Sequence, residues 1–483
     1  MISPTALAPP LAEYLPRQRW FGAKDRAIEL VRIRATETLS DEGAWPALLR
    51  VDAEVHFEGD GDGQARYQVL LGLRPTGVAC EFLAGHEPAV LGEFETSQGQ
   101  ALVYDALLDG ELALRLLRVV APDLPAERVR PLTAEQSNTS LVYDDAMILK
   151  VFRRLTEGHN PEVEVIETLA ACGFASVPEP LASWRKDGAD LAFLQRFLAG
   201  ATDGWNMALT SLRELFAEQT IGRTPPSPDA LGAADGGPVQ DTDPAEARGD
   251  FVAEAERIGE VTAEMHIALA KGFGGTKVTG ADWAAAMEEQ LDRVLGRGAA
   301  GGDPGDAALV ARARLIINRL KDIPDPGPAI RVHGDYHLAQ VLRTDAGWFV
   351  TDFEGEPARS LEERTRPSSP LKDVAGMLRS FSYAQAVALS YQEDDLAELG
   401  RAWETRNRDG FMAGYLRKAQ FDPETGNEPI LPRDPAVRSA VLAAFELDKA
   451  LYEVAYERAN RPDWARIPLD AVRRLTGAPA AIV

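Results

Sequence analysis

Two neighbouring stretches decide how this sequence is interpreted: VHGDYHLAQ at residues 332–340 and VTDFE at residues 350–354. Asp335 precedes the amide side chain of Gln340 by five positions, and Asp352 follows the next apolar run. Carboxylate and amide oxygens are the hard ligands that Mg²⁺ prefers in proteins. A lone His-Gly-Asp is ordinarily a turn before a strand, but partners at both spacings favour a site that handles phosphate and metal.

Kinases place a catalytic aspartate five residues before a metal-binding amide, and a second metal aspartate in an Asp-Phe-x unit on the next strand. By this pattern Asp335 is the predicted catalytic base, and Gln340 and Asp352 are the predicted Mg²⁺ ligands. Glu354 stands where protein kinases have glycine. Phosphoryl transfer requires a carboxylate to hold the acceptor hydroxyl and oxygen ligands to hold the metal. The sequence therefore predicts a phosphotransferase that uses ATP and Mg²⁺, on an α+β, protein-kinase-like fold.

An apolar, strand-like run at residues 146–152 carries Lys150 in its middle. A buried lysine requires an anionic partner, and kinases pair this lysine with donor phosphates and a helix glutamate. The helix is predicted to begin near Asn160 and Pro161, since proline suits the first helical turn. Among its glutamates, Glu164 is the favoured partner. The alternative is an edge-strand lysine that extends into solvent.

The segment before this strand has no glycine-rich loop, because no glycine lies between Gly110 and Gly158. Hydroxyl and amide side chains can cradle phosphate instead. Such clusters are ordinarily turns, so the position just before the Lys150 strand is what favours an ATP contact. An expected hinge at residues 194–198 adds two contacts. The predicted ATP-binding residues are Ser137, Asn138, Thr139, Ser140, Lys150, Glu164, Arg196 and Leu198.

The acceptor side is predicted from residues near Asp335 in sequence and from one helical face. Residues 446–456 place polar and aromatic side chains three and four apart, so that they share a face. Such a face suits sugar hydroxyls and sugar rings, although a surface salt-bridge stripe has the same pattern. The predicted acceptor contacts are His337, Glu354, Arg379, Glu446, Lys449, Tyr452 and Glu453.

Two further residues are predicted to act structurally. Asp373 opens a helical segment, where a capping role is the simplest interpretation. In kinase-like folds such an aspartate also braces the catalytic loop, and we expect the same here. His266 lies beside an apolar stripe of helical spacing and is expected to be structural.

At these residues the chain resembles the bacterial maltokinases, an actinobacterial family with an aminoglycoside-phosphotransferase-like kinase fold. The resemblance runs nearly end to end, through residues 18–21, 134–140, 148–154, 203–205, 352–357, 369–381, 446–453 and 461–464. It implies a cap domain before the kinase lobes and the conversion of ATP and maltose to ADP and maltose 1-phosphate, for α-glucan and glycogen synthesis. It also implies trehalose synthase as a protein partner.

Some positions depart from the family pattern and leave the acceptor open. Tyr336 and Ala339 stand where the family commonly has leucine and glycine, and insertions lie around residues 230 and 425. The alternative acceptors are glucosamine and an aminoglycoside. An aminoglycoside site should be strongly acidic, whereas Lys449 and Arg379 favour a neutral sugar such as maltose.

Three segments are expected. Residues 1–90 form a strand-rich cap domain, because apolar and polar residues alternate over residues 49–57 and resume over 67–73. Residues 91–199 form the smaller kinase lobe with the phosphate-binding elements and Lys150. Residues 200–483 form the mainly helical larger lobe, with an insertion at about 222–249 that is too poor in large apolar residues to order itself.

Composition limits the partners and the location. The formal charge is −24 over 483 residues, which argues against a nucleic-acid partner because phosphate backbones require dense Lys and Arg. No apolar run approaches the roughly 18 residues of a membrane helix, and the start has no signal-peptide pattern. We therefore expect a cytoplasmic enzyme without a membrane partner. Its two cysteines, Cys80 and Cys172, lie too far apart in sequence to suggest a disulfide framework or zinc site.

Overall fold

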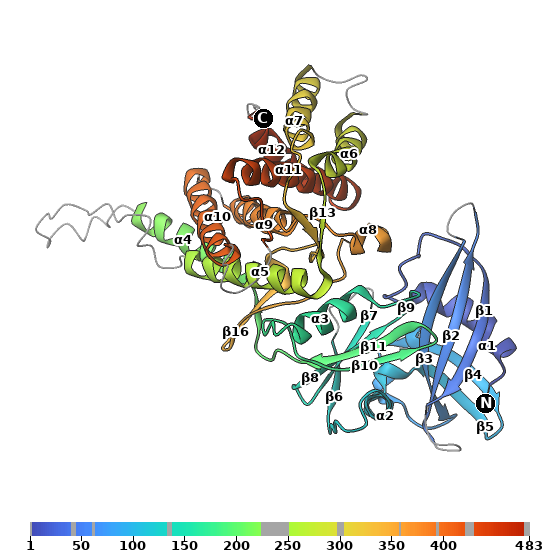
Figure 1. Ribbon diagram of the computed structural model, residues 1–483. Coiled ribbons are helices and arrows are strands. Elements are labelled where there is room, and N and C mark those ends of the chain that lie inside the picture. The colour runs from blue at the N-terminus through green and yellow to red at the C-terminus, as the bar shows by residue number, and fades with distance from the viewer. Residues whose placement is uncertain are drawn as a thin grey trace, which may run out of the picture. The chain divides into compact units, whose positions relative to one another are not determined.

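The computed structural model describes residues 2–39, 45–59, 63–132, 138–223, 251–296, 304–356, 359–392, 396–420 and 429–477 (Figure 1). The chain divides into two compact units. The first contains residues 1–167 and 178–199, and the second contains residues 168–177 and 200–483. The insertion predicted at 222–249 lies outside the described residues except for the end of one helix, and the insertion around residue 425 lies outside them.

The first unit begins with a helix and an antiparallel sheet of strand order β1-β2-β3-β5-β4, with β9 added beside β3. The hairpin predicted from alternation is confirmed, since Ala47–Phe57 pairs with Gln64–Pro75 in antiparallel register. The elements are α1 (Pro4–Tyr14), η1 (Leu15–Arg17), β1 (Ile28–Thr38), β2 (Ala47–Phe57), β3 (Gln64–Pro75), η2 (Glu81–Leu83), η3 (Glu87–Ala89), β4 (Val90–Thr96), β5 (Gly99–Asp105), η4 (Ala106–Leu108) and β9 (Arg154–Leu155).

Two features of this sheet go beyond what alternation alone indicates. The sheet continues through β4 and β5, so the strand-rich module runs past the predicted end at residue 90. The polar face of β2 is also not uniformly wet, because Arg50 and Asp52 are 1% and 2% exposed. Leu48 and Leu70 on the sheet join a core cluster with Leu149 of the next sheet, which covers that face. Alternation identified the strand but not the layer that covers it.

The second sheet of this unit has strand order β10-β11-β8-β7-β6 and carries Lys150 on β8. Its central position buries β8 between β7 and β11, which explains the apolar run around this lysine. The elements are α2 (Gly110–Val120), β6 (Val129–Leu132), β7 (Asn138–Tyr143), β8 (Met147–Phe152), α3 (Pro161–Ala171), β10 (Pro180–Lys186) and β11 (Ala189–Arg196). The final residues of α3 fall in the second unit.

The second unit is mainly helical. Its helices are α4 (Gly204–Arg223), α5 (Val252–Phe273), α6 (Gly280–Leu291), the π-helical η7 (Asp292–Gly296), α7 (Pro304–Lys321), η8 (Leu338–Gln340), α8 (Leu361–Thr365), α9 (Leu371–Ser390), α10 (Ala397–Ala419), α11 (Pro435–Asn460), η9 (Pro462–Trp464) and α12 (Arg466–Leu475). Among the described helices, none is long and apolar enough to cross a lipid bilayer.

Helix α9 is buried along most of its length and lies against α4, α10 and α11 (Figure 1). Helices α5 and α10 approach each other closely at a glycine. A Cβ atom on Gly259 would lie 2.1 Å from the carbonyl oxygen of Phe411, so only glycine fits there. This packing fixes α5, α9 and α10 as one frame.

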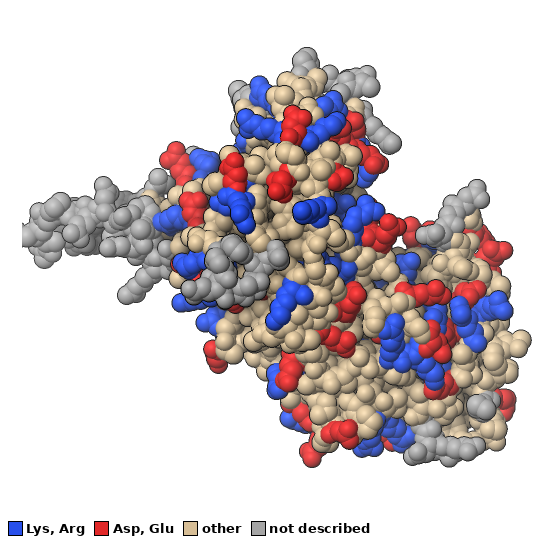
Figure 2. All heavy atoms as spheres, in the orientation of Figure 1, with Lys and Arg blue, Asp and Glu red and all other residues tan. Residues whose placement is uncertain are grey.

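Two small sheets carry the segment singled out in the sequence. They are β12 (Thr202–Asp203) with β15 (Val341–Thr344) and β16 (Gly347–Val350), and β13 (Gly275–Lys277) with β14 (Pro328–Ile330). The loop of residues 331–337 therefore leaves one sheet and enters the other through η8. Figure 2 shows Lys and Arg interspersed with Asp and Glu on the face in view, and many form local pairs, such as Arg417 with Glu260 at 2.7 Å.

Candidate active site

The loop that carries Asp335 is held by a buried carboxylate. Asp373, at the start of α9 and 1% exposed, accepts the backbone N–H of His333 at 2.8 Å and that of Gly334 at 2.9 Å. The predicted brace is therefore confirmed. His266 of α5 lies 3.0 Å from the same carboxylate, and its other ring nitrogen lies 3.0 Å from the hydroxyl of Tyr415 on α10. His266 is fully buried and structural, as predicted.

This carboxylate stays ionised in the core. Burial would raise the pKa of Asp373, but the hydrogen bond and charge of His266 and the N–H of Gly334 outweigh burial and lower it. An ionised acceptor makes stronger hydrogen bonds than a neutral one. The backbone of the loop is therefore fixed by charge-assisted bonds.

Two glycines let the loop pass close to α9. A Cβ atom on Gly376 would lie 2.5 Å from the carbonyl oxygen of Tyr336, so the loop backbone rests directly on the helix. Gly334 has φ +90°, a conformation that residues with a side chain rarely adopt. The hydroxyl of Tyr336 lies 2.9 Å from that of Thr262 on α5, which fixes the other side of the loop.

The two predicted metal ligands are brought together. Gln340, at the end of η8, donates from Nε2 to Asp352 at 2.9 Å, and its carbonyl accepts the N–H of Thr351 at 3.0 Å. Asp352 has φ +66°, a strained conformation for a residue other than glycine. Phe353 follows it and packs its ring 4.7 Å from that of His333. The Asp-Phe unit is thus anchored on the loop that carries Asp335.

The donor set at this point suits magnesium better than zinc. Within the described ranges, no group of three or more His, Cys, Asp or Glu side chains is arranged to hold a metal. Magnesium commonly takes one or two protein oxygens and completes its shell with water and substrate phosphate. Gln340 and Asp352 supply such oxygens, so these residues fit a magnesium ion.

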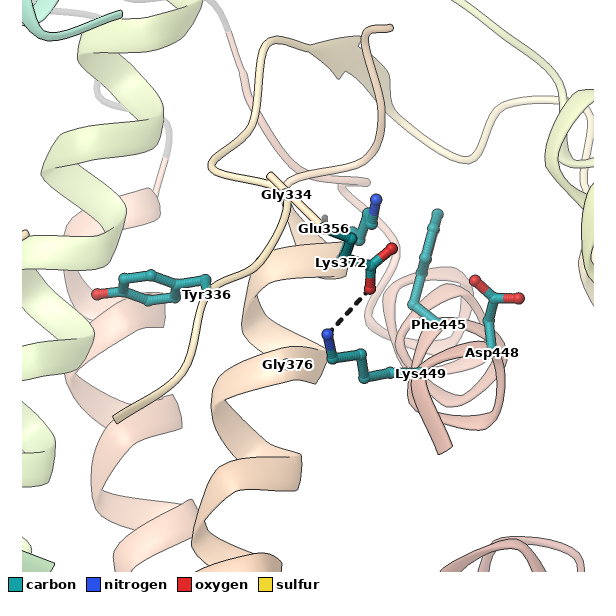
Figure 3. A pocket seen from close by; sticks show the side chains of 8 residues that line it. All are labelled: Gly334, Tyr336, Glu356, Lys372, Gly376, Phe445, Asp448 and Lys449. Atoms are coloured by element: carbon teal, nitrogen blue, oxygen red, sulfur yellow. Dashed lines mark hydrogen bonds and ion pairs between the residues drawn. The ribbon is translucent and has the colours of Figure 1, made fainter. Parts of the chain in front are cut away.

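Lys449 of α11 lies at the centre of the charged groups in this unit. Its Nζ is 2.9 Å from Oδ1 of Asp335 and 2.9 Å from Oε1 of Glu356. Figure 3 shows Lys449 reaching toward Glu356 beside Gly334 and Gly376. His337 lies on the other side, with Nε2 3.9 Å from Oδ2 of Asp335. The predicted catalytic aspartate is therefore in direct contact with a predicted acceptor residue.

The pKa values of Asp335, Lys449 and His337 are all shifted by burial and by the neighbouring charges. Burial would raise the pKa of Asp335, but Lys449 and then His337 hold it well below its usual range. Burial would lower the pKa of Lys449, but Asp335 and Glu356 hold it well above its usual range. Burial lowers the pKa of His337. At neutral pH, therefore, Asp335 is ionised and Lys449 is charged.

A small hollow lies beside these groups, lined by Gly334, Tyr336, Glu356, Lys372, Gly376, Phe445, Asp448 and Lys449 (Figure 3). Burial raises the pKa of Asp448 to about 6, and Gln290 donates to its carboxylate at 2.8 Å. Glu356 was not assigned a role from the sequence. The sequence signal that could have identified Glu356 is the run of acidic residues in DFEGE at 352–356.

The predicted acceptor residues divide into two groups. Tyr452 is linked to Asp335 by Lys449, since the Nζ of Lys449 contacts Asp335 and lies 4.9 Å from the centroid of the Tyr452 ring. Glu354 follows the metal-ligand pair in sequence, and its carbonyl accepts from Arg364 at 2.9 Å. These two residues and His337 lie on the elements that carry the candidate site.

The other three are engaged between helices. Arg379 of α9 is 2% exposed and pairs with Glu453 of α11 at 2.7 Å. Glu446 of α11 is 6% exposed and pairs with Arg408 of α10 at 2.8 Å. These buried charges neutralise one another and attach α11 to its neighbours, and the assignment of Arg379, Glu446 and Glu453 as acceptor contacts remains a prediction.

The first unit holds the donor-side candidates. Lys150 pairs with Glu162 at 2.6 Å, and both side chains are at most 10% exposed. This corrects the choice of Glu164. Asn160 accepts the N–H of Glu162 at 2.9 Å and so caps α3. This cap sets the start of α3, so that Glu162 in the first turn faces the strand of Lys150. The spacing of the glutamates in the sequence did not show which of them faces Lys150.

Of the remaining predicted ATP contacts, Asn138, Thr139 and Ser140 lie on β7, Arg196 ends β11, and Leu198 follows it. Ser140 is the register partner of Lys150, and Thr139 is the partner of Val151. Asn138 begins β7, whereas Ser137 lies outside the described residues. Arg196 is exposed and pairs with Glu179, and Leu198 is partly buried after the strand. These positions remain predictions.

The sequence of this chain is similar to a known domain family and to known kinases. Residues 14–109 match the family described as the maltokinase N-terminal cap domain. The chain is 29% identical over 352 residues to glucosamine kinase of Mycolicibacterium smegmatis, covering 70% of this chain and 77% of that one. It is 26% identical over 361 residues to glucosamine kinase of Streptacidiphilus jiangxiensis, covering 71% and 72%.

The fold is also shared with a solved structure. Glucosamine kinase in complex with glucosamine, ADP and inorganic phosphate has a TM-score of 0.63 and 21% identity, over 92% of this chain and 93% of that one. This likeness shows the mixed helix-and-sheet, kinase-like fold, and the cap match accounts for the strand-rich N-terminal region. The chain is therefore similar to the maltokinase family in its cap, over residues 14–109, and to glucosamine kinases in sequence and in the kinase-like fold.

Proposed function

We propose that this chain is a sugar kinase that transfers the γ-phosphoryl group of ATP to maltose and releases ADP and maltose 1-phosphate. The observation that carries the proposal is the contact of Asp335 with Lys449, at 2.9 Å. An ionised carboxylate beside a fixed ammonium can accept a hydrogen bond from a sugar hydroxyl and orient it, while the ammonium donates to a neighbouring oxygen. The match of residues 14–109 to the maltokinase cap supports maltose as the acceptor.

Each residue set has a distinct task in this reaction. Asp335 accepts the proton of the attacking hydroxyl as the bond to phosphorus forms and the bond to the ADP oxygen breaks. Lys150, paired with Glu162, is the candidate for the donor phosphates. Gln340 and Asp352 would hold Mg²⁺, which neutralises charge on the phosphates when bound.

A second acceptor is supported by the relatives. Both curated relatives described above are glucosamine kinases, so glucosamine is the alternative acceptor. The local charge favours the neutral sugar, because Lys449 places an ammonium 2.9 Å from the carboxylate that would orient the acceptor. The ammonium of glucosamine would have to compete with Lys449 for Asp335 and Glu356. The proposed cytoplasmic location rests on the composition of the sequence, and the proposed trehalose synthase partner rests on the sequence resemblance.

Replacing Asp335 with asparagine should lower kcat by roughly 100- to 10,000-fold, because the amide cannot accept the hydroxyl proton. Nucleotide affinity should change little, since the residues assigned to the donor phosphates are intact. The rate is measured by ADP release with saturating sugar, and the binding by titration calorimetry with ATP. A variant that keeps more than about half of the wild-type rate would rule out general-base catalysis by Asp335.

Replacing Lys449 with methionine should move the acid limb of the kcat/KM profile to higher pH. Burial alone raises the pKa of Asp335, so loss of the ammonium makes this carboxylate easier to protonate. The Lys372→Met variant is the control, because Lys372 lines the same hollow and acts on Glu356 and Asp448. An acid limb that does not move in Lys449→Met, or that moves equally in both variants, would contradict this role.

The same pair makes stability depend on pH in a defined direction. The pKa of Asp335 lies below its ordinary 3.8 and that of Lys449 above its ordinary 10.5. Their contribution to the free energy of unfolding is therefore complete between these values. It is lost as the pH falls through the folded pKa of Asp335 or rises through that of Lys449.

The acceptor is tested by the ratio of kcat/KM for maltose to that for glucosamine, with glucose as a third substrate. We expect maltose to be preferred by about tenfold or more, a difference of about 1.4 kcal/mol in transition-state binding. Glucose should be poor, because the second ring helps to orient the reacting hydroxyl. A preference for glucosamine would contradict maltose as the acceptor, but it would not contradict the proposed role of Asp335 in phosphoryl transfer.

A further inference from the structure

Arg153 is a buried cation that no step above uses. It lies directly after β8 and is 1% exposed. Its Nη2 donates to both carboxylate oxygens of Asp105, at 2.9 and 2.7 Å, and its Nε donates to Oγ1 of Thr139 at 2.9 Å. The guanidinium therefore joins the last residue of β5 to the second residue of β7. Both residues are in the first unit.

The N-terminal segment fixes Asp105 and Arg153 from the cap side. Tyr14, at the end of α1, donates to Asp105 at 3.1 Å and is fully buried. The ring of Trp20 lies under the guanidinium, with its centroid 4.7 Å from Cζ of Arg153. A guanidinium stacked on an aromatic ring and bonded to a carboxylate loses most of its freedom. This accounts for Trp20 in the QRWF segment at residues 18–21, which has no chemistry of its own.

The other end of the contact is the strand proposed to meet nucleotide. Thr139 and Ser140 are predicted ATP contacts, and Ser140 is the register partner of Lys150. The side chain of Thr139 can accept one hydrogen bond from Arg153 and still turn its own hydrogen toward another acceptor. Arg153 also follows Lys150 by three positions and comes directly after the last residue of β8. A shift of Arg153 would thus displace both β7 and the end of β8.

We propose that Arg153 is a positioning residue through which the cap sets the nucleotide-binding strand β7. The inference rests on the proposed function, since it assigns the Thr139 region to ATP. It gives the cap domain a task in catalysis, namely to hold β7 and β8 in the geometry that binds the donor phosphates. Arg153 itself does not touch the nucleotide.

The test compares two buried arginines of the same unit. Arg50 is also 1% exposed, and its side chain bonds to Gln68 at 3.2 Å and Glu37 at 3.4 Å. Each of the two arginines keeps one buried nitrogen without a hydrogen-bond partner in the described part of the chain. Arg50→Met is therefore a matched control for the loss of a buried cation that does not bond to Thr139.

The dissociation constant for ATP with Mg²⁺ is measured by titration calorimetry, at a temperature well below the melting point of every variant. Arg153→Met should weaken ATP binding by about tenfold, which corresponds to about 1.4 kcal/mol. Arg50→Met should change the dissociation constant for ATP less than about twofold, even if it lowers the melting temperature as much as Arg153→Met does. Equal effects of the two variants on ATP affinity would overturn the proposal.

A double-mutant cycle separates positioning from general destabilisation. Thr139→Val removes the acceptor of the Arg153 Nε–H, so Arg153→Met should have a smaller effect on ATP affinity in that background than in wild type. Fully additive effects would overturn the proposal. If Arg153→Met fails to fold, Asp105→Asn is used instead, because it weakens the cap-side contact of Arg153 and leaves Thr139 intact; unchanged ATP affinity in that variant would overturn the proposal. A wild-type chain that does not bind ATP would instead overturn the proposed function, and this inference with it.

Discussion

The active-site half in the second unit depends on one buried carboxylate, that of Asp373. It accepts two backbone N–H groups of the catalytic loop and a ring nitrogen of His266. Backbone donors left unpaired in a core cost about 1–3 kcal/mol each, so this carboxylate determines which loop conformation is stable. Through His266 and Tyr415 it also ties the loop to α5 and α10. The side chain of Asp335 therefore extends from a backbone that α5, α9 and α10 hold in place.

The second constraint is electrostatic. Asp335 lies before β15 and Glu356 after β16, and the ammonium of Lys449 bridges the two carboxylates. Without it, burial would raise the pKa of Asp335, as burial does for Asp448, whereas Glu356 would keep Arg359 as a partner. The bridge keeps the proposed base ionised at neutral pH and presents a donor beside it. Acid–base chemistry and acceptor choice are therefore linked through one residue of α11.

Local spacing predicted that Gln340 and Asp352 lie together, because Asp335, Gln340 and Asp352 belong to one loop–strand–strand segment; their roles in catalysis and metal binding stay predictions. The fold class and the brace at Asp373 followed from the same pattern. Long-range pairing could not be read in this way. Helical spacing grouped Glu446, Lys449 and Glu453 on one face, but only the fold shows that two of them meet arginines of neighbouring helices while Lys449 meets Asp335. The choice of Glu164 over Glu162 failed for a similar reason, since the direction of a first-turn side chain depends on the cap.

The most direct test of this account is amide hydrogen exchange at His333 and Gly334, in the wild-type chain and in Asp373→Asn. Asparagine offers one neutral oxygen in place of two charged ones, so at least one of the two N–H groups loses its acceptor. The account predicts strong protection of both amides in the wild type and exchange faster by about tenfold or more in the variant, in line with a lost bond of about 1.4 kcal/mol. Equal protection in the two proteins would show that Asp373 does not hold the catalytic loop.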